Sequence, residues 1–496
     1  MTAVALGKLF DDLPQELAAM TVSGITTDSR NVTQGGLFLA VQGFANHGLE
    51  FLDQALENGA AVVAWEPAQG VAEPEAVDGV LMIEVQDLGL ATGILADEFF
   101  GHPSMILNVA GITGTNGKTT TAWLAAEAAN RLGAKSGYMG TLGYGFADQL
   151  EPAPLTTPGV VSVHRRLSEM ADAGAANVFM EVSSHGLDQG RVDAVRFKVA
   201  AFTNLSRDHL DYHGSLEAYG QAKAALFTEF QPEFAVLNVA DEFGRELARL
   251  LHKDVHLLSV SADPRHEAAL VAELVNAGTD GLQVRFSGEY GEAELHSSLW
   301  GRFNVENLAV ATGILLGLGV SLGDAVQALA ECAAPAGRME PVSDSSEQPQ
   351  VIIDFAHTPD ALEQVLNCVR EHCDGALWCV FGCGGDRDTG KRAEMGRIAG
   401  SLADRVVLTD DNPRDEDPAV IIDDVLQGFI ELPQPQIIHD RAEAITTAVG
   451  SAVAGDVVLV AGKGAENYQI RAGEQIEFSD QLVAKQALAE IYGGVQ

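Results

Sequence analysis

The segment from Leu107 to Leu132 constrains the fold more than any other part of the chain. Its apolar start, Leu107-Asn-Val-Ala-Gly-Ile112, predicts a buried strand, and residues 121–132 predict a helix. Between them lies the glycine-rich stretch Gly114-Thr-Asn-Gly-Lys-Thr-Thr120. A strand, a glycine-rich turn and a helix in this order are typical of α/β folds with a largely parallel sheet that bind nucleotides.

The glycine-rich stretch has the chemistry to bind the phosphates of ATP. Glycines let successive backbone N–H groups face a phosphate, and the start of the helix adds partial positive charge. Lys118 is expected to reach the outer phosphates, and the Thr119 hydroxyl to bind Mg²⁺. Ile112 stands where the general phosphate-loop pattern has glycine. We predict ATP contacts at Gly114, Thr115, Asn116, Gly117, Lys118, Thr119 and Thr120.

The chain is long enough for about three domains, and its pattern divides at two places. The first part predicts a small mixed α/β domain, residues 1–97. Strand–turn–helix alternation then predicts a central phosphate-loop domain with a parallel sheet, residues 98–336. A stretch that begins Pro335-Ala-Gly-Arg-Met-Glu-Pro341 and stays polar to Gln350 indicates a linker. Beyond it we predict a Rossmann-like C-terminal domain, residues 337–496.

The predicted third domain repeats one arrangement four times. An apolar run stops at a polar loop at Val351-Ile-Ile-Asp-Phe355, Leu377-Trp-Cys-Val-Phe381, Val406-Val-Leu-Thr409 and Val457-Val-Leu-Val-Ala461. In open α/β sheets, ligands bind beyond the carboxyl ends of the strands, where such loops gather. The four loops therefore predict that this domain holds part of a binding site.

The charge of the chain excludes several classes of partner. Seventy acidic and 30 basic residues give a formal net charge of -40. Such a field repels nucleic acid and anionic membrane surfaces, so neither is an expected partner. The first residues lack the pattern of a signal peptide, and no apolar stretch reaches the ~18 residues of a membrane span. We expect a cytoplasmic protein, and a monomer.

Three segments together resemble the Mur ligases and their folylpolyglutamate synthetase relatives. The first is Gly114-Thr-Asn-Gly-Lys-Thr-Thr120. The second, Met180-Glu-Val-Ser-Ser-His-Gly-Leu187, carries Glu181, and the third, Thr203-Asn-Leu-Ser-Arg-Asp-His-Leu-Asp-Tyr-His213, carries His209. The resemblance covers essentially the whole chain. It implies an ATP-dependent ligase that forms amide bonds, with Glu181 and His209 as metal ligands beside Thr119.

The segment Leu216-Glu-Ala-Tyr-Gly-Gln-Ala-Lys-Ala-Ala-Leu-Phe227 predicts an amphipathic helix that carries Lys223. By itself, Lys223 would be a solvated surface lysine. The resemblance implies instead that CO₂ carbamylates it, which turns a cation into an anionic ligand for a second Mg²⁺. We therefore expect two Mg²⁺ ions, with Lys118, His209 and Lys223 as the catalytic residues.

Among Mur ligases, the chain most resembles those that act on UDP-N-acetylmuramoyl-L-alanyl-D-glutamate (UDP-MurNAc-L-Ala-D-Glu). Ser29, in Thr27-Asp-Ser-Arg30, matches the family's uridine contact. Thr156 and Thr157, in Leu155-Thr-Thr-Pro158, match its contacts to the muramoyl-dipeptide. The resemblance implies further contacts to this substrate at Ser183, Gln189 and Arg191.

The third domain resembles the C-terminal domain of the Mur ligases that use meso-2,6-diaminopimelate as the amine substrate. The motif Asp411-Asn-Pro-Arg414 is similar to the family's diaminopimelate signature, with contacts implied at Asp411, Asn412, Pro413 and Arg414. Diaminopimelate differs from lysine by a second carboxylate, which a planar guanidinium binds with two hydrogen bonds. The resemblance adds Arg387 for a carboxylate, Glu466 for an ammonium, and Gly462. Ala465, Ala393 and Leu155 depart from the family pattern.

The resemblance implies that a carboxylate attacks ATP, an acyl phosphate forms, and the amine of diaminopimelate displaces phosphate during peptidoglycan synthesis. Three alternatives stay open: a ligase that adds L-lysine, a ligase like folylpolyglutamate synthetase, and a nucleotide-binding regulator without activity. Arg414 argues against the first and Ser29 against the second. The joint presence of Lys118, Thr119, Glu181, His209 and Lys223 argues against the third.

Overall fold

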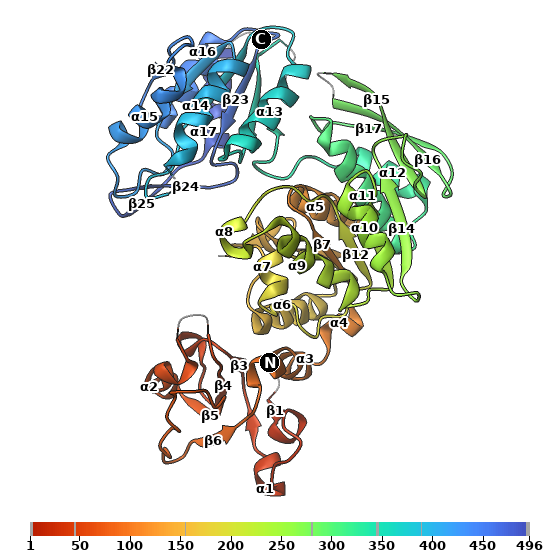
Figure 1. The fold of residues 1–496 in the computed structure, drawn as a ribbon, viewed down its shortest axis with the longest axis vertical. Helices are drawn as coiled ribbons and strands as arrows, with labels where there is room; N and C mark the ends of the chain where they lie inside the picture. Colours follow the sequence, from red (N-terminus) through yellow and green to blue (C-terminus); the bar gives the residue numbers. More distant parts are fainter. Residues whose placement is uncertain are drawn as a thin grey trace. The chain divides into compact units, whose positions relative to one another are not determined.

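The computed structural model describes residues 3–43, 46–153, 155–278, 281–343, 347–387 and 389–492 (Figure 1). The chain divides into two compact units, each described by itself. The first consists of Met1–Lys118, Ala129–Ser259 and Gly317–Gly319, and the second of Thr119–Ala128, Val260–Leu316 and Val320–Gln496. No helix in the described part of the chain has the length and apolar content that a membrane crossing needs.

The first unit begins with a small mixed α/β region. Its four-stranded sheet is parallel, in the order β3 (Ile25–Thr26), β4 (Gly36–Ala40), β5 (Ala60–Trp65) and β6 (Leu81–Glu84). The helices of this region are η1 (Leu6–Lys8), α1 (Gln15–Ala18), η2 (Ser29–Asn31), η3 (Gly48–Phe51), α2 (Leu52–Glu57) and α3 (Leu88–Phe99). A two-stranded antiparallel pair, β1 (Val4–Ala5) and β2 (Thr21–Val22), precedes the sheet. The predicted mixed α/β character of this region is confirmed.

The first unit also contains the strands around the glycine-rich loop. Their order is β10 (Gln149–Glu151), β9 (Gly143–Phe146), β8 (Ser136–Gly140), β11 (Asn177–Glu181), β7 (Asn108–Thr113), β12 (Val199–Phe202) and β13 (Phe234–Asn238). Five neighbouring strands run parallel, namely β8, β11, β7, β12 and β13. Strand β9 pairs antiparallel with both β8 and β10. Six helices of this part are α4 (Pro103–Ile106), α6 (Val160–Asp172), α7 (Ser184–Asp188), α8 (Leu210–His213), α9 (Leu216–Thr228) and α10 (Glu242–Leu250).

The predicted strand and helix on either side of the glycine-rich loop are confirmed. β7 lies one residue later than predicted, and helix α5 (Lys118–Arg131) begins at the lysine of the loop. Because β7 is the middle strand of the five parallel strands, its carboxyl end has a neighbouring strand end on each side. Ile112 lies inside β7 and is 0% exposed, so it is a core residue in this fold.

The second unit contains an antiparallel sheet and the C-terminal α/β region. Strands β15 (Leu270–Gly278), β16 (Gly281–Gly288) and β17 (Ala293–Ser297) follow β14 (His256–Ser261), which pairs in parallel with β15. Helices α11 (Phe303–Gly317) and α12 (Leu322–Ala330) come next.

The C-terminal region is a six-stranded sheet in the order β18 (Glu340–Pro341), β19 (Gln350–Asp354), β23 (Val457–Ala461), β20 (Leu377–Phe381), β21 (Arg405–Leu408) and β22 (Gln436–Ile437). All but β18 run parallel. Its helices are α13 (Pro359–Glu371), α14 (Gly390–Leu402), α15 (Pro418–Leu426), η4 (Gln427–Phe429), α16 (Arg441–Ser451) and α17 (Asp480–Tyr492). The hairpin β24 (Tyr468–Arg471) and β25 (Glu474–Glu477) precedes α17.

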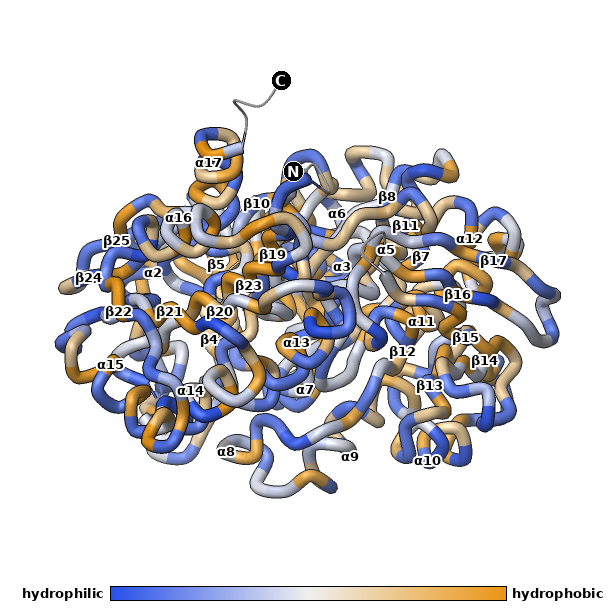
Figure 2. The backbone as a smooth tube through the Cα atoms, turned by 90° about the horizontal axis from the view of Figure 1, so that it is seen from above, coloured by the Kyte–Doolittle hydropathy of each residue, from blue (hydrophilic) through white to orange (hydrophobic). Residues whose placement is uncertain are grey.

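Alternate residues of these strands face opposite sides of the C-terminal sheet. Ile352 packs with residues of α13, α14 and α15 on one side, whereas Val351 and Ile353 pack with residues of α16 and α17 on the other. A strand buried on both faces reads as a continuous apolar run, and Figure 2 shows orange segments along β20 and β23. Helices on both faces of a parallel sheet confirm the predicted Rossmann-like fold.

The predicted linker differs from the structure in one respect. Its residues Glu340 and Pro341 form β18, which pairs antiparallel with Ile353 and Ile352 of β19. The polar composition of the segment gave no sign of this two-residue strand, which lies at the edge of the sheet and pairs only with β19. The chain therefore joins the C-terminal sheet before β19 begins.

Candidate active site

The glycine-rich loop after β7 is held by the loop that follows the adjacent strand β12. The Thr203 hydroxyl donates to the Asn116 carbonyl at 2.6 Å, and the Asn116 N–H donates to Asn204 Oδ1 at 2.9 Å. Gly114 and Gly117 have φ angles of +150° and +81°. A Cβ atom at Gly114 would lie 1.9 Å from Thr203 Oγ1. The path of this loop therefore depends on glycine at Gly114.

Two lysines converge on the carbonyl oxygen of Gly114. Lys118 Nζ donates to it at 2.9 Å and also donates to the Thr115 carbonyl at 2.9 Å. Lys223 Nζ, from α9, donates to the same Gly114 oxygen at 2.9 Å and lies 4.2 Å from the centre of the Tyr219 ring. Lys223 is 1% exposed. Burial, with the charge of Lys118 as the next cause, lowers the pKa of Lys223 well below its usual value.

Lys223 is therefore a buried amine beside the glycine-rich loop. It is not the solvated surface lysine that its residue type alone would indicate. A lowered pKa raises the fraction of neutral amine at a given pH. The amine of Lys223 is therefore neutral in a larger fraction of molecules than the amine of a solvated lysine.

Glu181 ends strand β11, the neighbour of β7, and is 1% exposed. Its carboxylate accepts hydrogen bonds from the Tyr138 hydroxyl, from the Thr141 N–H at 2.9 Å and from the Thr141 hydroxyl at 3.2 Å. A Cβ atom at Gly140 would lie 2.2 Å from Glu181 Oε1. The carboxylate therefore has a fixed orientation at the carboxyl end of the sheet.

The predicted substrate contacts of the first unit other than Ser29 lie close together. The Thr157 hydroxyl donates to the Glu181 carbonyl at 3.0 Å, and Thr157 Oγ1 lies 3.1 Å from Ser183 Oγ. Arg191 donates through Nη1 to the Thr157 carbonyl at 2.9 Å and through Nε to Gln189 Oε1 at 3.1 Å. The Thr156 hydroxyl lies 3.1 Å from that of Thr141, a partner of Glu181. The fold thus brings these polar groups beside the carboxylate.

His209 lies in a group of aromatic rings that sequence reasoning did not find. Its φ is +52°, and its ring centre is 4.8 Å from that of His185 and 6.0 Å from that of Tyr219. Tyr212 lies 4.2 Å from His185. Within the described ranges, no group of three or more His, Cys, Asp or Glu side chains could hold a metal ion. The predicted metal ligands Glu181 and His209 therefore do not belong to such a group in the described ranges.

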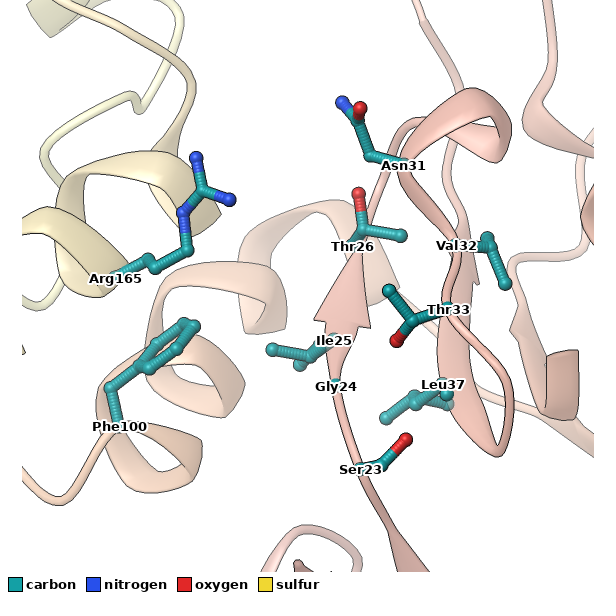
Figure 3. Close-up of a pocket in the computed structure, with 11 residues that line it drawn as sticks. Ser23, Gly24, Ile25, Thr26, Asn31, Val32, Thr33, Leu37, Phe100 and Arg165 are labelled. Carbon is teal, nitrogen blue, oxygen red and sulfur yellow. The ribbon is translucent and has the colours of Figure 1, made fainter. Parts of the chain in front are cut away.

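Ser29, the predicted uridine contact, is buried in η2. Its hydroxyl donates to Gln54 Oε1 at 2.7 Å, and its carbonyl accepts from Asn58 Nδ2 at 2.9 Å. A cavity of about 260 Å³ lies near the amino ends of β3 and β4, where Figure 3 shows Arg165 opposite Thr26. Ser29 is not among its described lining residues. Asn31, two residues after Ser29 in η2, does line it.

In the second unit, two arginines flank Gly384 in the loop after β20. Arg414 has a φ of +54°, and its Nη1 donates to the Gly385 carbonyl at 2.7 Å. A Cβ atom at Gly384 would lie 3.0 Å from Arg414 Nη1 and 3.8 Å from Arg387 Cγ. The loops after β20 and β21 thus bring these side chains together, as expected for loops at neighbouring carboxyl ends.

Glu466, after β23, already has two partners. Its Oε2 accepts from Asn412 Nδ2 at 2.9 Å and from Lys463 Nζ at 2.9 Å. Lys463 is 0% exposed and also donates to Asn412 Oδ1 at 3.1 Å. Gly462 has a φ of +119°, and a Cβ atom there would lie 2.8 Å from Asp411 Oδ2.

Sequence reasoning missed Lys463. Its signal was a lysine between two glycines, directly after a buried strand.

Comparison with protein families explains this arrangement. Residues 21–100 match the model of the Mur ligase family, catalytic domain, residues 112–315 that of the Mur ligase middle domain, and residues 337–464 that of the Mur ligase, glutamate ligase domain. The chain belongs to the Mur ligase family. Mur ligases use ATP and Mg²⁺, in agreement with the glycine-rich loop of this chain.

Named relatives of this Mur ligase are UDP-N-acetylmuramoyl-L-alanyl-D-glutamate–2,6-diaminopimelate ligases. Those of Xylella fastidiosa (strain Temecula1) and Pseudomonas aeruginosa are each 46% identical, over 98% of both chains. A solved structure of an enzyme of this name is 34% identical over 99% of both chains, with a TM-score of 0.73. MurF from Acinetobacter baumannii, at 20% identity and a TM-score of 0.67 over 93% of this chain and 96% of its own, shares the fold.

Proposed function

We propose that this Mur ligase adds meso-2,6-diaminopimelate to the D-glutamyl side-chain carboxylate of UDP-MurNAc-L-Ala-D-Glu, using ATP, in peptidoglycan synthesis. The observation that carries the choice of amine is the pair Arg387 and Arg414 beside Gly384. The names and 46% identity of its relatives support it. Each of the two carboxylates of diaminopimelate can pair with one guanidinium group, whereas L-lysine, with a single carboxylate, would leave one of them unpaired.

We propose that the reaction starts when the D-glutamyl carboxylate attacks the γ-phosphate of ATP. ADP leaves and an acyl phosphate forms. The neutral amine of diaminopimelate then attacks the acyl carbon, the amide bond forms as the bond from that carbon to the phosphate oxygen breaks, phosphate leaves, and the nitrogen releases a proton to solvent. The Lys118 ammonium offsets the charge of the associating anions. No nucleophilic side chain is needed, because the substrates supply both nucleophiles.

The oxygen-rich surroundings of Glu181 fit Mg²⁺, which prefers oxygen ligands. We propose Thr119, Glu181, His209 and carbamylated Lys223 as the protein ligands of two ions. When bound, Mg²⁺ supplies positive charge that offsets the phosphates. Tyr138 and Thr141 orient the Glu181 carboxylate through the three hydrogen bonds described above.

We propose that Lys223 carries the carbamate. Its neutral amine attacks CO₂, a C–N bond forms and a proton leaves to solvent. The burial of Lys223 supports this step, because burial favours the neutral amine. Rates that depend on bicarbonate in the wild type, together with loss of activity in Lys223→Ala, would support the carbamate. Full activity without CO₂ would contradict it.

We propose that Ser29, Thr156, Thr157, Ser183, Gln189 and Arg191 bind UDP-MurNAc-L-Ala-D-Glu. Diaminopimelate is assigned to Arg387, Asp411, Asn412, Pro413, Arg414, Gly462 and Glu466. The salt bridge from Lys463 to Glu466 bears on this assignment, because the incoming ammonium must share that carboxylate with Lys463. The domain limits 1–97, 98–336 and 337–496, a cytoplasmic location and a monomeric state remain our predictions.

An isotope experiment tests the proposed reaction. The D-glutamyl side-chain carboxylate of the substrate is labelled with oxygen-18, and the released phosphate is analysed by mass spectrometry. An acyl phosphate predicts label in the phosphate, because the carboxylate oxygen that attacks phosphorus leaves with it. Diaminopimelate-dependent release of unlabelled phosphate would contradict the acyl phosphate.

A further inference from the structure

Arg392, on α14, is buried beneath the two loops that carry Arg387 and Arg414. It is 0% exposed, and its guanidinium donates to Glu416 through two bonds of 2.7 Å, Nη1 to Oε1 and Nη2 to Oε2. Nη1 also donates to Asp424 Oδ2 at 2.9 Å, from the neighbouring helix α15 (Figure 1). The proposed reaction uses none of these three residues directly.

Glu416 connects the loop after β21 to the loop after β20. It stands two residues after Arg414, and its Oε2 accepts the Asp386 N–H at 3.0 Å. Asp386, the residue before Arg387, has a φ of +52° and accepts the Asp415 N–H through Oδ2 at 3.2 Å. Arg392 Nη2 adds a 3.3 Å bond to the Gly384 carbonyl between the two arginines.

Two residues of these loops have backbone conformations that residues with a side chain seldom adopt. Asp386 and Arg414 have φ angles of +52° and +54°. Such conformations persist only where the surroundings enforce them. The Glu416 carboxylate accepts hydrogen bonds from the Asp386 N–H and from the buried side chain of Arg392. It therefore holds the conformations of the loops after β20 and β21 together.

The charges agree with this role. Arg392 is paired with two carboxylates, so its own charge is balanced within the protein. Its hydrogen bond to Glu416 lowers the pKa of that carboxyl to about 2, which keeps Glu416 ionised at neutral pH. Arg392 therefore does not compete for a ligand carboxylate, which the proposed function assigns to Arg387 and Arg414.

We infer that Arg392 and Glu416 are positioning residues that set the spacing of Arg387 and Arg414, and thereby the selectivity for an amine that bears a second carboxylate. This inference rests on the proposed function. The pair acts through the two loops and touches no substrate. A merely structural pair would instead affect folding and all substrates alike.

The test compares Glu416→Gln with wild type in the full-length protein. We expect the KM for meso-diaminopimelate to rise about 10-fold to 100-fold, the range for a lost hydrogen bond to a charged group. The KM for ATP and kcat/KM for L-lysine should stay within about twofold. The matched control is Glu394→Gln, which removes the partner of Arg397 at 4.0 Å in an exposed pair on the same helix.

Three outcomes would overturn the inference: an unchanged KM for diaminopimelate, an unchanged preference over L-lysine, or equal losses for every substrate. If Glu416→Gln does not fold, Asp424→Asn replaces it, because Asp424 contacts only Nη1 and is more exposed than Glu416. For Asp424→Asn we expect the KM for diaminopimelate to rise about threefold, and an unchanged KM would overturn the inference. The wild-type protein distinguishes failure of this inference from failure of the proposed function. If the wild type shows no preference for diaminopimelate over L-lysine, the proposed function itself is refuted.

Discussion

Replacing Gly114 with alanine tests the account of the nucleotide loop most sharply. The new methyl group would lie 1.9 Å from Thr203 Oγ1, at a position where φ is +150°. The loop can relieve the contact only by moving Thr203, whose hydroxyl then loses its 2.6 Å bond to the Asn116 carbonyl. ATP binding must restore the displaced loop, so we expect the cost to appear in the Kd for ATP.

The magnitude follows from two terms. Alanine at this φ costs roughly 1–3 kcal/mol, and the lost Thr203 bond costs roughly 0.5–1.5 kcal/mol. Together they correspond to a Kd that rises between about 10-fold and 2,000-fold. Thr203→Ala by itself should cost only the second term, about 2-fold to 10-fold.

Titration calorimetry with a non-hydrolysable ATP analogue and Mg²⁺ measures these values. The double variant Gly114→Ala/Thr203→Ala removes the clashing oxygen, so its loss should fall short of the sum of the single losses by about 1 kcal/mol. The control is Gly323→Ala, in α12, where a Cβ atom would meet nothing within 4 Å. It should leave the Kd unchanged. A folded Gly114→Ala protein with a wild-type Kd, or strictly additive losses, would refute the reasoning.

Three further predictions concern the site. Tyr138→Phe removes a hydrogen bond to Glu181 and should raise the Mg²⁺ requirement about 10-fold to 100-fold in steady-state assays; an unchanged requirement would contradict this orienting role. Arg414→Lys should lower kcat/KM for diaminopimelate about 10-fold to 100-fold and spare L-lysine, whereas equal losses would speak against a carboxylate contact. Because the pKa of Lys223 is lowered in the folded protein, the unfolded chain binds more protons between that pKa and 10.5, and stability rises with pH there. In CO₂-free buffer, Lys223→Met should flatten that rise in urea unfolding, and an unchanged slope would contradict the lowered pKa.

Local sequence patterns predicted those parts of the fold that depend on residues close together in the sequence. The strand before the glycine-rich loop was placed within one residue of β7, because a run of buried apolar residues followed by glycines has few other solutions. The four strand ends of the C-terminal sheet were found for the same reason. Neighbouring parallel strands then bring Arg387 and Arg414 together, as loops at one sheet edge must.

Contacts between distant residues could not be predicted in this way. Lys223 meets the carbonyl of Gly114 across 109 residues, and helical periodicity alone does not say which loop a helix covers. Arg392 could not be singled out from the sequence, because its partners Glu416 and Asp424 lie 24 and 32 residues away. The burial of Lys463 was missed because a lysine between glycines is usually a solvated turn residue.

The central claim is that the chain joins diaminopimelate to a carboxylate using ATP. Phosphate release measured with UDP-MurNAc-L-Ala-D-Glu and ATP, in parallel with meso-diaminopimelate, with L-lysine and without an amine, tests it most directly. We predict rapid release with diaminopimelate, release at least about 100-fold slower with L-lysine, and none above background without an amine. Release that does not depend on an amine, or equal rates with the two amines, would contradict the claim.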